Sequence, residues 1–396
     1  NFMSDNKLKS LTHIFNESFF RIPDFQRGYS WGEHQLNDFW EDIENLKKGR
    51  THYTGLLTVE QVTSTEILKS ERWSDDVWLI ERGMSAYYLI DGQQRLTTSI
   101  ILINEILRDL PDDSEFNFKE VSYWKDKFLY QKFKDEYVSY MFGYERDNPS
   151  DEYFKTKILN RTSSTSDKVP ERTLYTQNLY FAKEYFKGKV KDLPHEEKEE
   201  VFKKIIMSFK FNFYEIDDDL DVYVTFETMN NRGKPLSNLE LLKNRLIYLS
   251  TLIEEDDGLK LRLRKDINES WKTIYEYLGK NKEKPLGDDD FLKDHWITYF
   301  EYNRKESDVY AKFLLNDYFT PKRVLTNKLS YNEIKAYVDS ISTSIKHYYN
   351  IFNPEKSNLD DEIKTWLERL NRLGHTFFVP LIMVTLEKEE NSKKIS

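Results

Sequence analysis

Hydrophobic side chains along the chain repeat with two different periods. A spacing of three or four residues predicts helices, whereas alternation or a run of β-branched and aromatic residues predicts strands. The helical period covers 36–46, 93–110, 174–187, 195–208 and most of 236–390. The strand patterns cover 54–62, 87–90 and 209–216. The sequence therefore predicts an α+β fold, in which a mixed α/β N-terminal domain precedes an all-helical region.

Two segments of the first part follow neither period clearly. Residues 64–86 are charged and carry two tryptophans, and residues 112–172 are weakly periodic, with a Ser/Thr cluster at 161–167. Clusters of this composition are typical of loops. We interpret both segments as insertions in the N-terminal domain.

The composition narrows the class of protein. The 26 Tyr, 26 Phe and 8 Trp residues among 396 can build several cores, because each buries roughly 150–250 Å² when packed. The absence of cysteine excludes disulfides, thiolate nucleophiles and Cys-bound metals. No apolar run reaches the roughly 18 residues of a transmembrane helix. We expect a soluble, cytoplasmic protein with no membrane partner.

The net charge of −10 argues against indiscriminate coating of nucleic acid, which depends on a basic excess. Selective binding through a local basic surface remains open. The stretch Arg262, Arg264 and Lys265 could contact phosphates, or could be the solvated face of a surface helix.

The common phosphate and metal motifs are absent from the sequence. There is no G-x-x-x-x-G-K-[ST], no G-x-G-x-x-G and no H-E-x-x-H, and the seven histidines are isolated. His295 lies within a helical pattern, so we interpret it as a partly buried packing residue.

Three glycine–arginine clusters remain, at 22–31, 89–98 and 226–236. The second cluster reads as a strand, a glycine turn and a helix start, which places Gln93, Gln94 and Arg95 at a positive helix N-terminus suited to phosphate. Each cluster alone is compatible with ordinary turn chemistry. Together they predict one anion-binding site, because arginine offers a planar set of donors and the amides add donors without charge.

The three clusters also resemble a known family. They read I-P-x-F-Q-R-x-Y-x-W, D-G-Q-Q-R-L-T-T and F-x-x-x-N-x-R-G-x-x-L, which is very similar to the signature of the GmrSD-type N-terminal domain family. That family also includes SspE-like and BrxU-like restriction proteins. The resemblance covers roughly 1–250, which we take as the first domain, and leaves 251–396 as a helical domain and linker.

The resemblance implies a ParB/sulfiredoxin-like fold that binds and hydrolyses a nucleoside triphosphate (ATP, GTP or CTP) with Mg²⁺ and without a Walker motif. It implies a catalytic role for Asp91, Gln93, Gln94 and Arg95, with Asp91 also holding the metal. It implies a nucleotide-binding role for Gln26, Arg27, Tyr29, Trp31, Gly92, Thr97, Thr98, Asn230, Arg232 and Gly233. Tyr29 and Trp31 would stack a base, although packing is an equal alternative for Trp31.

The resemblance further implies a type IV-like restriction role against phage DNA that carries modified cytosine or a phosphorothioate backbone. An HNH nuclease motif is not found in the sequence. We therefore expect DNA cleavage to require a further C-terminal domain or a separate nuclease subunit, and the Lys/Glu-rich end favours a truncated chain. Association of several copies of the chain into a homo-oligomer is a further partner that we consider. Two alternatives stay open: a modified-DNA sensor that binds nucleotide without hydrolysis, and a specificity subunit that depends on a nuclease partner.

Overall fold

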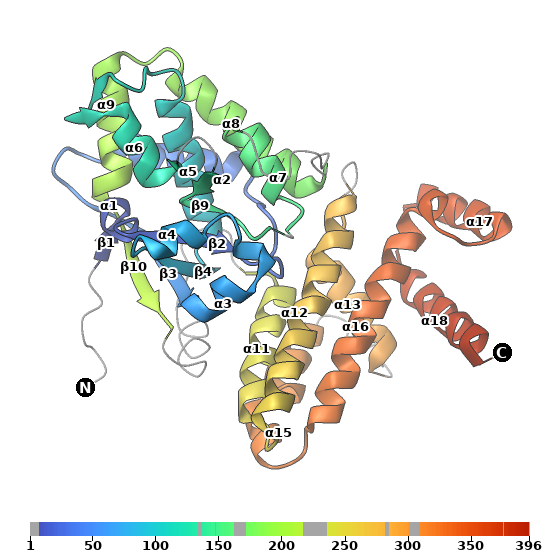
Figure 1. Ribbon diagram of the computed structural model, residues 1–396. Helices are drawn as coiled ribbons and strands as arrows, with labels where there is room; N and C mark the ends of the chain where they lie inside the picture. Colours follow the sequence, from blue (N-terminus) through green and yellow to red (C-terminus); the bar gives the residue numbers. More distant parts are fainter. Residues whose placement is uncertain are drawn as a thin grey trace. The chain divides into compact units, whose positions relative to one another are not determined.

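The computed structural model describes residues 8–133, 137–146, 148–161, 172–216, 236–281, 285–300, 309–374 and 376–395. Its contacts divide the chain into two compact units. We call Asn1–Pro235 the N-terminal unit and Leu236–Ser396 the helical unit, and we describe each by itself (Figure 1).

A six-stranded mixed sheet forms the centre of the N-terminal unit. Its strands, in spatial order, are β1 (Leu8–Ser10), β10 (Phe209–Glu215), β3 (His52–Gln61), β4 (Ser85–Asp91), β2 (Ser18–Ile22) and β9 (Phe142–Tyr144). The pairs β10–β3, β2–β4 and β2–β9 are parallel, and β1–β10 and β3–β4 are antiparallel. The mixed sheet and the helical second unit confirm the predicted α+β class. The predicted strands correspond to β3, β4 and β10.

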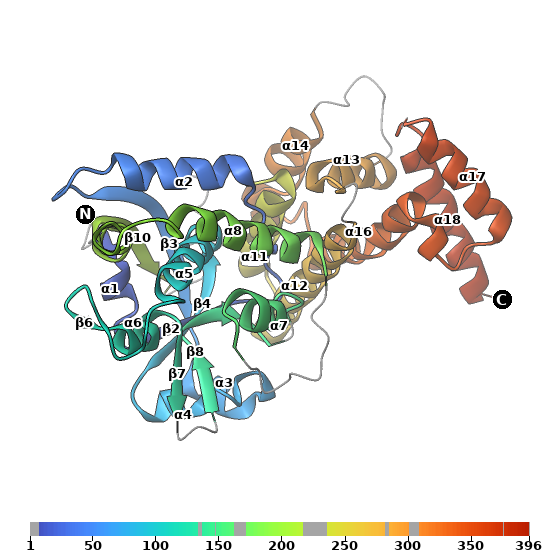
Figure 2. The ribbon, with the colours of Figure 1, turned by 90° about the horizontal axis from the view of Figure 1, so that it is seen from above.

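Helices and short hairpins cover this sheet. Among the described residues of this unit, the α-helices are α1 (Leu11–Ile14), α2 (Glu33–Asn45), α3 (Ser64–Lys69), α4 (Val77–Glu81), α5 (Gln93–Leu107), α6 (Val121–Phe128), α7 (Asp151–Tyr153), α8 (Leu174–Val190) and α9 (His195–Lys203). Two-stranded hairpins pair β5 (Glu115–Phe116) with β6 (Lys119–Glu120) and β7 (Tyr130–Phe133) with β8 (Tyr137–Tyr140). α5 packs against α8 and α6 (Figure 2), and it also contacts α9.

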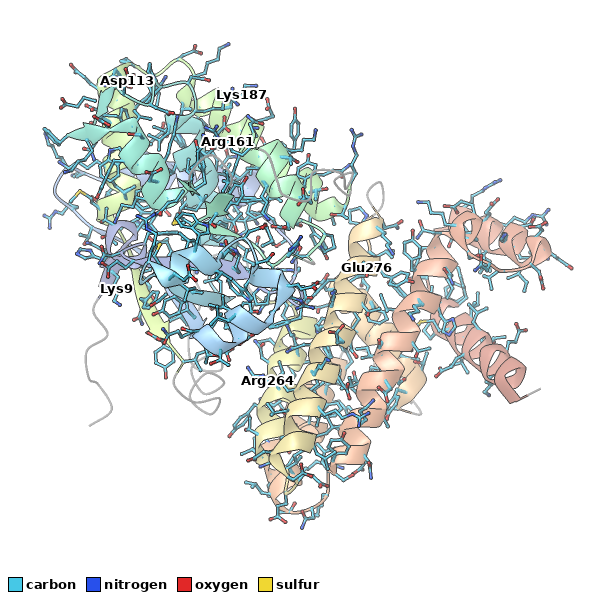
Figure 3. The ribbon with its side chains drawn as sticks, viewed as in Figure 1. Lys9, Asp113, Arg161, Lys187, Arg264 and Glu276 are labelled. Atoms are coloured by element: carbon cyan, nitrogen blue, oxygen red, sulfur yellow. The ribbon has the colours of Figure 1, made fainter. Side chains whose placement is uncertain are left out.

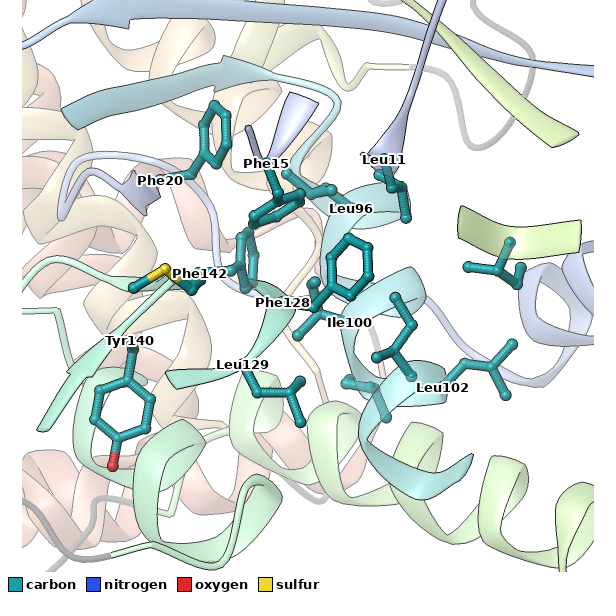
Figure 4. Packing of buried hydrophobic residues seen from close by; sticks show 14 of the residues in the cluster. Leu11, Phe15, Phe20, Leu96, Ile100, Leu102, Phe128, Leu129, Tyr140 and Phe142 are labelled. Carbon is teal, nitrogen blue, oxygen red and sulfur yellow. The ribbon is translucent and has the colours of Figure 1, made fainter. Parts of the chain in front are cut away.

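Aromatic side chains dominate the core of the N-terminal unit. Phe15 contacts Phe20 and Phe128 edge-on, with ring centroids 5.1 and 5.6 Å apart, and Leu96 and Ile100 of α5 lie in the same cluster (Figure 4). Edge-to-face pairs of this kind add to the stabilisation that burial provides. The core thus joins strands of the sheet to α5 and α6.

The segments 64–86 and 112–172 both contribute to this core. Trp73 and Leu79 from the first segment and Trp124 from the second are buried in the same cluster, and β9 belongs to the main sheet. Most of the Ser/Thr cluster at 161–167 lies outside the described residues.

The helical unit is built from α11 (Asn238–Leu252), α12 (Asp257–Lys280), α13 (Asp288–Tyr299), α14 (Tyr310–Lys312), α15 (Pro321–Leu325), α16 (Tyr331–Phe352), α17 (Asp361–Arg372) and α18 (Val379–Ile395). Ser237 and Ser330 begin α11 and α16 with capping boxes, as their S-x-x-E sequences indicate. Trp271 of α12 is fully buried and donates its indole N–H to Leu239 O at 3.0 Å. In the described part of the chain, no helix is both long and apolar enough to cross a membrane.

A buried ion pair links β2 to the 64–86 segment. Arg21 Nη2 lies 2.9 Å from Asp76 Oδ1, and both side chains are less than a tenth exposed. Arg21 also donates to the carbonyl oxygens of Phe20 and Tyr140. Because all of these groups are removed from water, the pair tolerates the loss of neither partner.

We predict that Asp76→Ala lowers the free energy of unfolding by about 3–5 kcal/mol, because it leaves the Arg21 guanidinium buried without its counter-charge. Urea unfolding followed by circular dichroism measures the change. Glu184→Ala is the matched control, since it removes an exposed ion pair with Lys187 and is expected to cost about 1 kcal/mol or less. An equal loss in both variants would contradict the prediction.

Candidate active site

The turn between β4 and α5 has the geometry that its sequence predicts. β4 ends at Asp91, Gly92 takes φ +86° as the N-cap residue, and α5 begins at Gln93. A Cβ at Gly92 would lie 2.6 Å from Leu56 O and 2.8 Å from Leu57 Cδ1, so the left-handed backbone and the lack of space both require glycine. The first backbone N–H groups of α5 are therefore presented immediately after the strand.

Only two residues of α5 are accessible to solvent. The other 13 of its 15 residues are buried, and the exceptions are Gln94 and Arg95 in the first turn. A helix that is buried on all sides can expose chemistry only at an end. Gln94 and Arg95 are thus the side chains of this helix that bulk solvent reaches.

Arg95 lies against β3. A Cβ at Gly55, which has φ +140°, would overlap the Nη1 atom of Arg95. Burial lowers the pKa of the Arg95 guanidinium, and the charges of Asp91 and Tyr53 oppose this shift. No hydrogen bond or ion pair of the guanidinium is found within the described residues. Arg95 is therefore a partly desolvated cation whose position is set by its close packing against Gly55 of β3.

Gln94, in the second cluster at 89–98, is hydrogen-bonded to the first cluster at 22–31. Its Oε1 accepts from Ser30 N at 2.8 Å and its Nε2 donates to Gly28 O at 3.3 Å. Gln26 adds a third link, since its Nε2 donates to Ile90 O at 3.2 Å, next to Asp91. The structure thus brings the 23–31 loop and the β4–α5 turn together, as the single-site hypothesis requires.

The predicted base-stacking residues are buried. Tyr29 is 1% and Trp31 is 5% exposed, and both belong to the hydrophobic core. Tyr29 Oη pairs with Thr98 Oγ1 at 2.7 Å, and burial raises its pKa. Thr97 donates to Gln93 O at 2.6 Å. Trp31 therefore packs in the core, which is the alternative that the sequence left open for it. Tyr29, Thr97 and Thr98 are likewise held by packing and by hydrogen bonds within the domain. The rings of Tyr29 and Trp31 are too deeply buried to stack on a base.

Several buried polar atoms around the turn have no hydrogen-bond partner. They are Gln93 Oε1, Ser30 Oγ, Thr54 Oγ1 and Thr58 Oγ1. Thr58 is the register partner of Asp91 across β3 and β4. Because buried polar atoms are nearly always paired in folded proteins, such a group of unsatisfied atoms indicates a place for water or a ligand. Arg27 is also buried, in the loop that Gln94 holds.

The third cluster cannot be placed. Asn230, Arg232 and Gly233 lie in 217–235, outside the described residues. The last residue before that segment, Ile216, donates its N–H to Val59 O of β3 at 2.9 Å.

Sequence reasoning missed Gly55 and Tyr53 at this site, and it identified Gly28 only as the turn glycine of the first cluster. Gly28 is not in a left-handed conformation, but a Cβ there would overlap the ring of Tyr175. Gly55 contacts Arg95, and Tyr53 is 41% exposed and acts electrostatically on it. The sequence signal for Gly55 is a glycine inside a β-branched run, which is typical of a close approach by another group.

Other candidate positions have structural explanations. His295 is fully buried, so it is buried more deeply than predicted; burial lowers its pKa to about 3, and its Nε2 lies 3.0 Å from Ser340 Oγ. Arg262 and Lys265 are exposed on α12, where Figure 3 labels Arg264. Among the described residues, no three His, Asp or Glu side chains cluster to hold a metal.

Comparison with known proteins identifies the family. Residues 9–247 match the family model described as the GmrSD restriction endonuclease, N-terminal domain. The chain belongs to this family. The match covers more than half of the chain and includes both the β4–α5 turn and the 23–31 loop, so the chain carries a domain of restriction-defence proteins. No curated protein matches the sequence.

We predict that Gln94→Ala frees the 23–31 loop, because it removes the acceptor of the Ser30 N–H and the donor to Gly28 O. Amide hydrogen exchange at Ser30 should accelerate by about tenfold, which corresponds to a lost hydrogen bond of about 1.4 kcal/mol.

Gln35→Ala is the control for this variant. Gln35 Oε1 accepts from Gly32 N at 2.9 Å, a bond of the same kind at the start of α2. Its loss should change exchange at Gly32 and leave Ser30 protected. Unchanged exchange at Ser30 in Gln94→Ala would show that other contacts hold the loop.

Proposed function

We propose that the β4–α5 turn binds and hydrolyses a nucleoside triphosphate, and that the chain acts as the nucleotide-dependent sensor part of a modification-dependent restriction protein. The observation that carries this proposal is the position of Arg95. It is a partly desolvated cation at the N-terminus of α5, in the part of that helix that solvent reaches.

Phosphate binding suits this position for two reasons. The N-terminal N–H groups of a helix and its dipole attract anions. An arginine fork adds charge-assisted hydrogen bonds, which are stronger where water is excluded. A bound phosphate would also add negative charge beside the partly desolvated Arg95 guanidinium, in addition to that of Asp91.

Hydrolysis requires charge stabilisation and a positioned water more than covalent chemistry. Arg95, together with Arg27 from the loop that Gln94 holds, would offset the negative charge that develops on the phosphoryl oxygens. Gln93 offers an unsatisfied buried oxygen that can accept from the attacking water. Gln94, whose amide bonds the loop, would act as a positioning residue.

Mg²⁺ would enter with the nucleotide. Octahedral Mg²⁺ keeps several waters and often takes only one or two carboxylates in addition to phosphate oxygens. Asp91 is the carboxylate at the turn, half-buried at the end of β4 and close enough to act on Arg95. Bound there, the ion would neutralise phosphate charge, while Asp91 would hold it directly or through water.

Modified phage DNA is the proposed signal, and cleavage would require an HNH nuclease in a further domain or a partner subunit. The net charge of −10 favours selective recognition over general affinity for DNA. ATP, GTP and CTP are all candidate substrates.

We predict that Arg95→Ala lowers the rate of phosphate release by at least about 100-fold, the effect of removing one charge-stabilising donor. Phosphate release is measured with ATP, GTP and CTP, with and without Mg²⁺ and modified DNA. Arg95→Lys keeps the charge but loses the fork, and should be intermediate.

Arg50→Ala is the control for this series, because Arg50 is exposed in the turn before β3. Equal rates for the Arg95→Ala variant and the parent would rule out the assignment. Nucleotide binding without phosphate release in the parent would favour the non-hydrolysing sensor instead.

We predict that Gly55→Ala lowers phosphate release by about tenfold or more, because the new Cβ displaces the Arg95 guanidinium and a misplaced group weakens transition-state contacts. Gly49→Ala is the matched control: Gly49 also has a left-handed φ, +78°, but nothing lies within 4 Å of its added Cβ. Both variants should lose about 1–2 kcal/mol of stability to backbone strain, and only Gly55→Ala should lose activity.

A further inference from the structure

The first turn of α5 lies beside β3 beyond the point where β4 ends. The register of β3 with β4 ends at Thr58, which lies opposite Asp91. From there toward the start of β3, the turn glycine packs against the backbone of residues 56–57, and the Arg95 guanidinium packs against Gly55. The proposed phosphate site therefore follows β3 from Thr58 toward Gly55.

Tyr53 continues this line along β3. It is 41% exposed, and it lies two residues before Gly55 on the same strand. It also contributes to the electrostatic environment of Arg95. Residues two apart in a strand have Cα atoms at most about 7 Å apart, a separation that a ribose can bridge. An accessible aromatic ring therefore lies within reach of a nucleoside whose phosphates contact Arg95.

Tyr53 is accessible, unlike the aromatic residues to which the family resemblance gave base stacking. Tyr29 and Trp31 are 1% and 5% exposed and belong to the core. A base can stack only on a ring with an accessible face. Aromatic side chains that stack in this way accept any base, because every base has a π face. Tyr53 thus supplies the stacking surface that the 23–31 loop does not offer.

A buried oxygen without a hydrogen-bond partner lies next to this stretch of β3. Side chains alternate along β10, so residues 210, 212 and 214 point to one face of the sheet. Their register partners on β3 are Tyr53, Leu56 and Thr58, in that order. Asn212 is therefore one register step from Tyr53 toward Thr58. Its Oδ1 atom is buried and has no hydrogen-bond partner among the described residues, which indicates a place for a donor such as a hydroxyl group.

We propose that the nucleoside part of the substrate lies along β3, with its base stacked on Tyr53 and a ribose hydroxyl donating to Asn212 Oδ1. The phosphates then reach Arg95 and the N-terminus of α5. This inference rests on the proposed function, since it assigns the other half of the same substrate. It gives Tyr53 and Asn212 a role in binding and leaves hydrolysis to the β4–α5 turn.

The order of these groups along the strand matches the order of groups in a nucleotide. Tyr53 lies at one end of this stretch of β3 and the β4–α5 turn lies at the other. Asn212, from β10, and Arg95, from the β4 side, flank the strand between them. Stacking does not read the edge of a base, so the site accepts ATP, GTP and CTP with a modest preference set by stacking strength.

Isothermal titration calorimetry of the full chain with two probes tests this proposal. The probes are the non-hydrolysable β,γ-imido analogue of ATP and inorganic triphosphate, which lacks both base and sugar, each with Mg²⁺. Tyr53→Ala should weaken binding of the analogue about 10- to 100-fold, the effect of losing one stacked base, and should leave binding of triphosphate unchanged. Tyr53→Trp keeps a stacking ring and should bind the analogue as the parent does.

Three further variants complete the series. Asn212→Ala should weaken binding of the analogue about fivefold, since it removes one hydrogen bond, and should leave binding of triphosphate unchanged. Arg95→Ala should weaken binding of both probes, because it acts on the phosphates. Tyr123→Ala is the matched control for Tyr53→Ala: Tyr123 on α6 is 44% exposed, and its loss should change binding of neither probe.

The outcomes separate the nucleoside site from the proposed function. A parent that binds neither probe overturns both. A parent that binds the two probes equally tightly, or binding of the analogue that Tyr53→Ala leaves unchanged, overturns the nucleoside site alone. An equal loss of both probes in Tyr53→Ala overturns it as well, because Tyr53 would then act on the phosphate site. Circular dichroism checks that each variant folds.

Discussion

The burial of α5 is the constraint on which the rest of the N-terminal unit depends. A helix enclosed by the sheet, α6, α8 and α9 cannot tilt or slide without opening the core, so its first turn is held in one place. The fixed first turn holds three sets of groups in position: the N–H groups after Gly92, the amide of Gln94 and the guanidinium of Arg95. Chemistry that relies on pre-positioned charge needs such a support.

Glycine provides the close approaches that bring the site together. Gly92 lets α5 start against the backbone of β3, and Gly55 leaves room in β3 for the guanidinium of Arg95. Gly28 lets the 23–31 loop pass the ring of Tyr175. Each of these glycines lies where two elements meet and where a side chain would not fit. The three glycines therefore allow close packing between elements, in addition to any effect on local backbone conformation.

Local patterns predicted the elements that are long and periodic, such as β3, β10 and α5. They did not predict β1, β2 and β9, because strands of three to five residues are too short to show a period. The glycine turn before α5 was readable from Asp91-Gly92. The bonds from Gln94 to Gly28 and Ser30 were not, since they join residues more than 60 positions apart. Aromatic character alone could not separate stacking from packing at Tyr29 and Trp31, because both roles use the same side chains.

The pairing of β10 with β3 has a consequence for how the protein is made. Phe209 pairs with His52, so the strand that carries Gly55 gains its parallel neighbour only after most of the N-terminal unit has left the ribosome. Contacts between distant parts of a chain slow folding, and unpaired edges attract other strands in the meantime. One edge of β3 therefore stays unpaired in the nascent chain while the helices between β4 and β10 are synthesised. Completion of the sheet is a late event in the synthesis and folding of the protein.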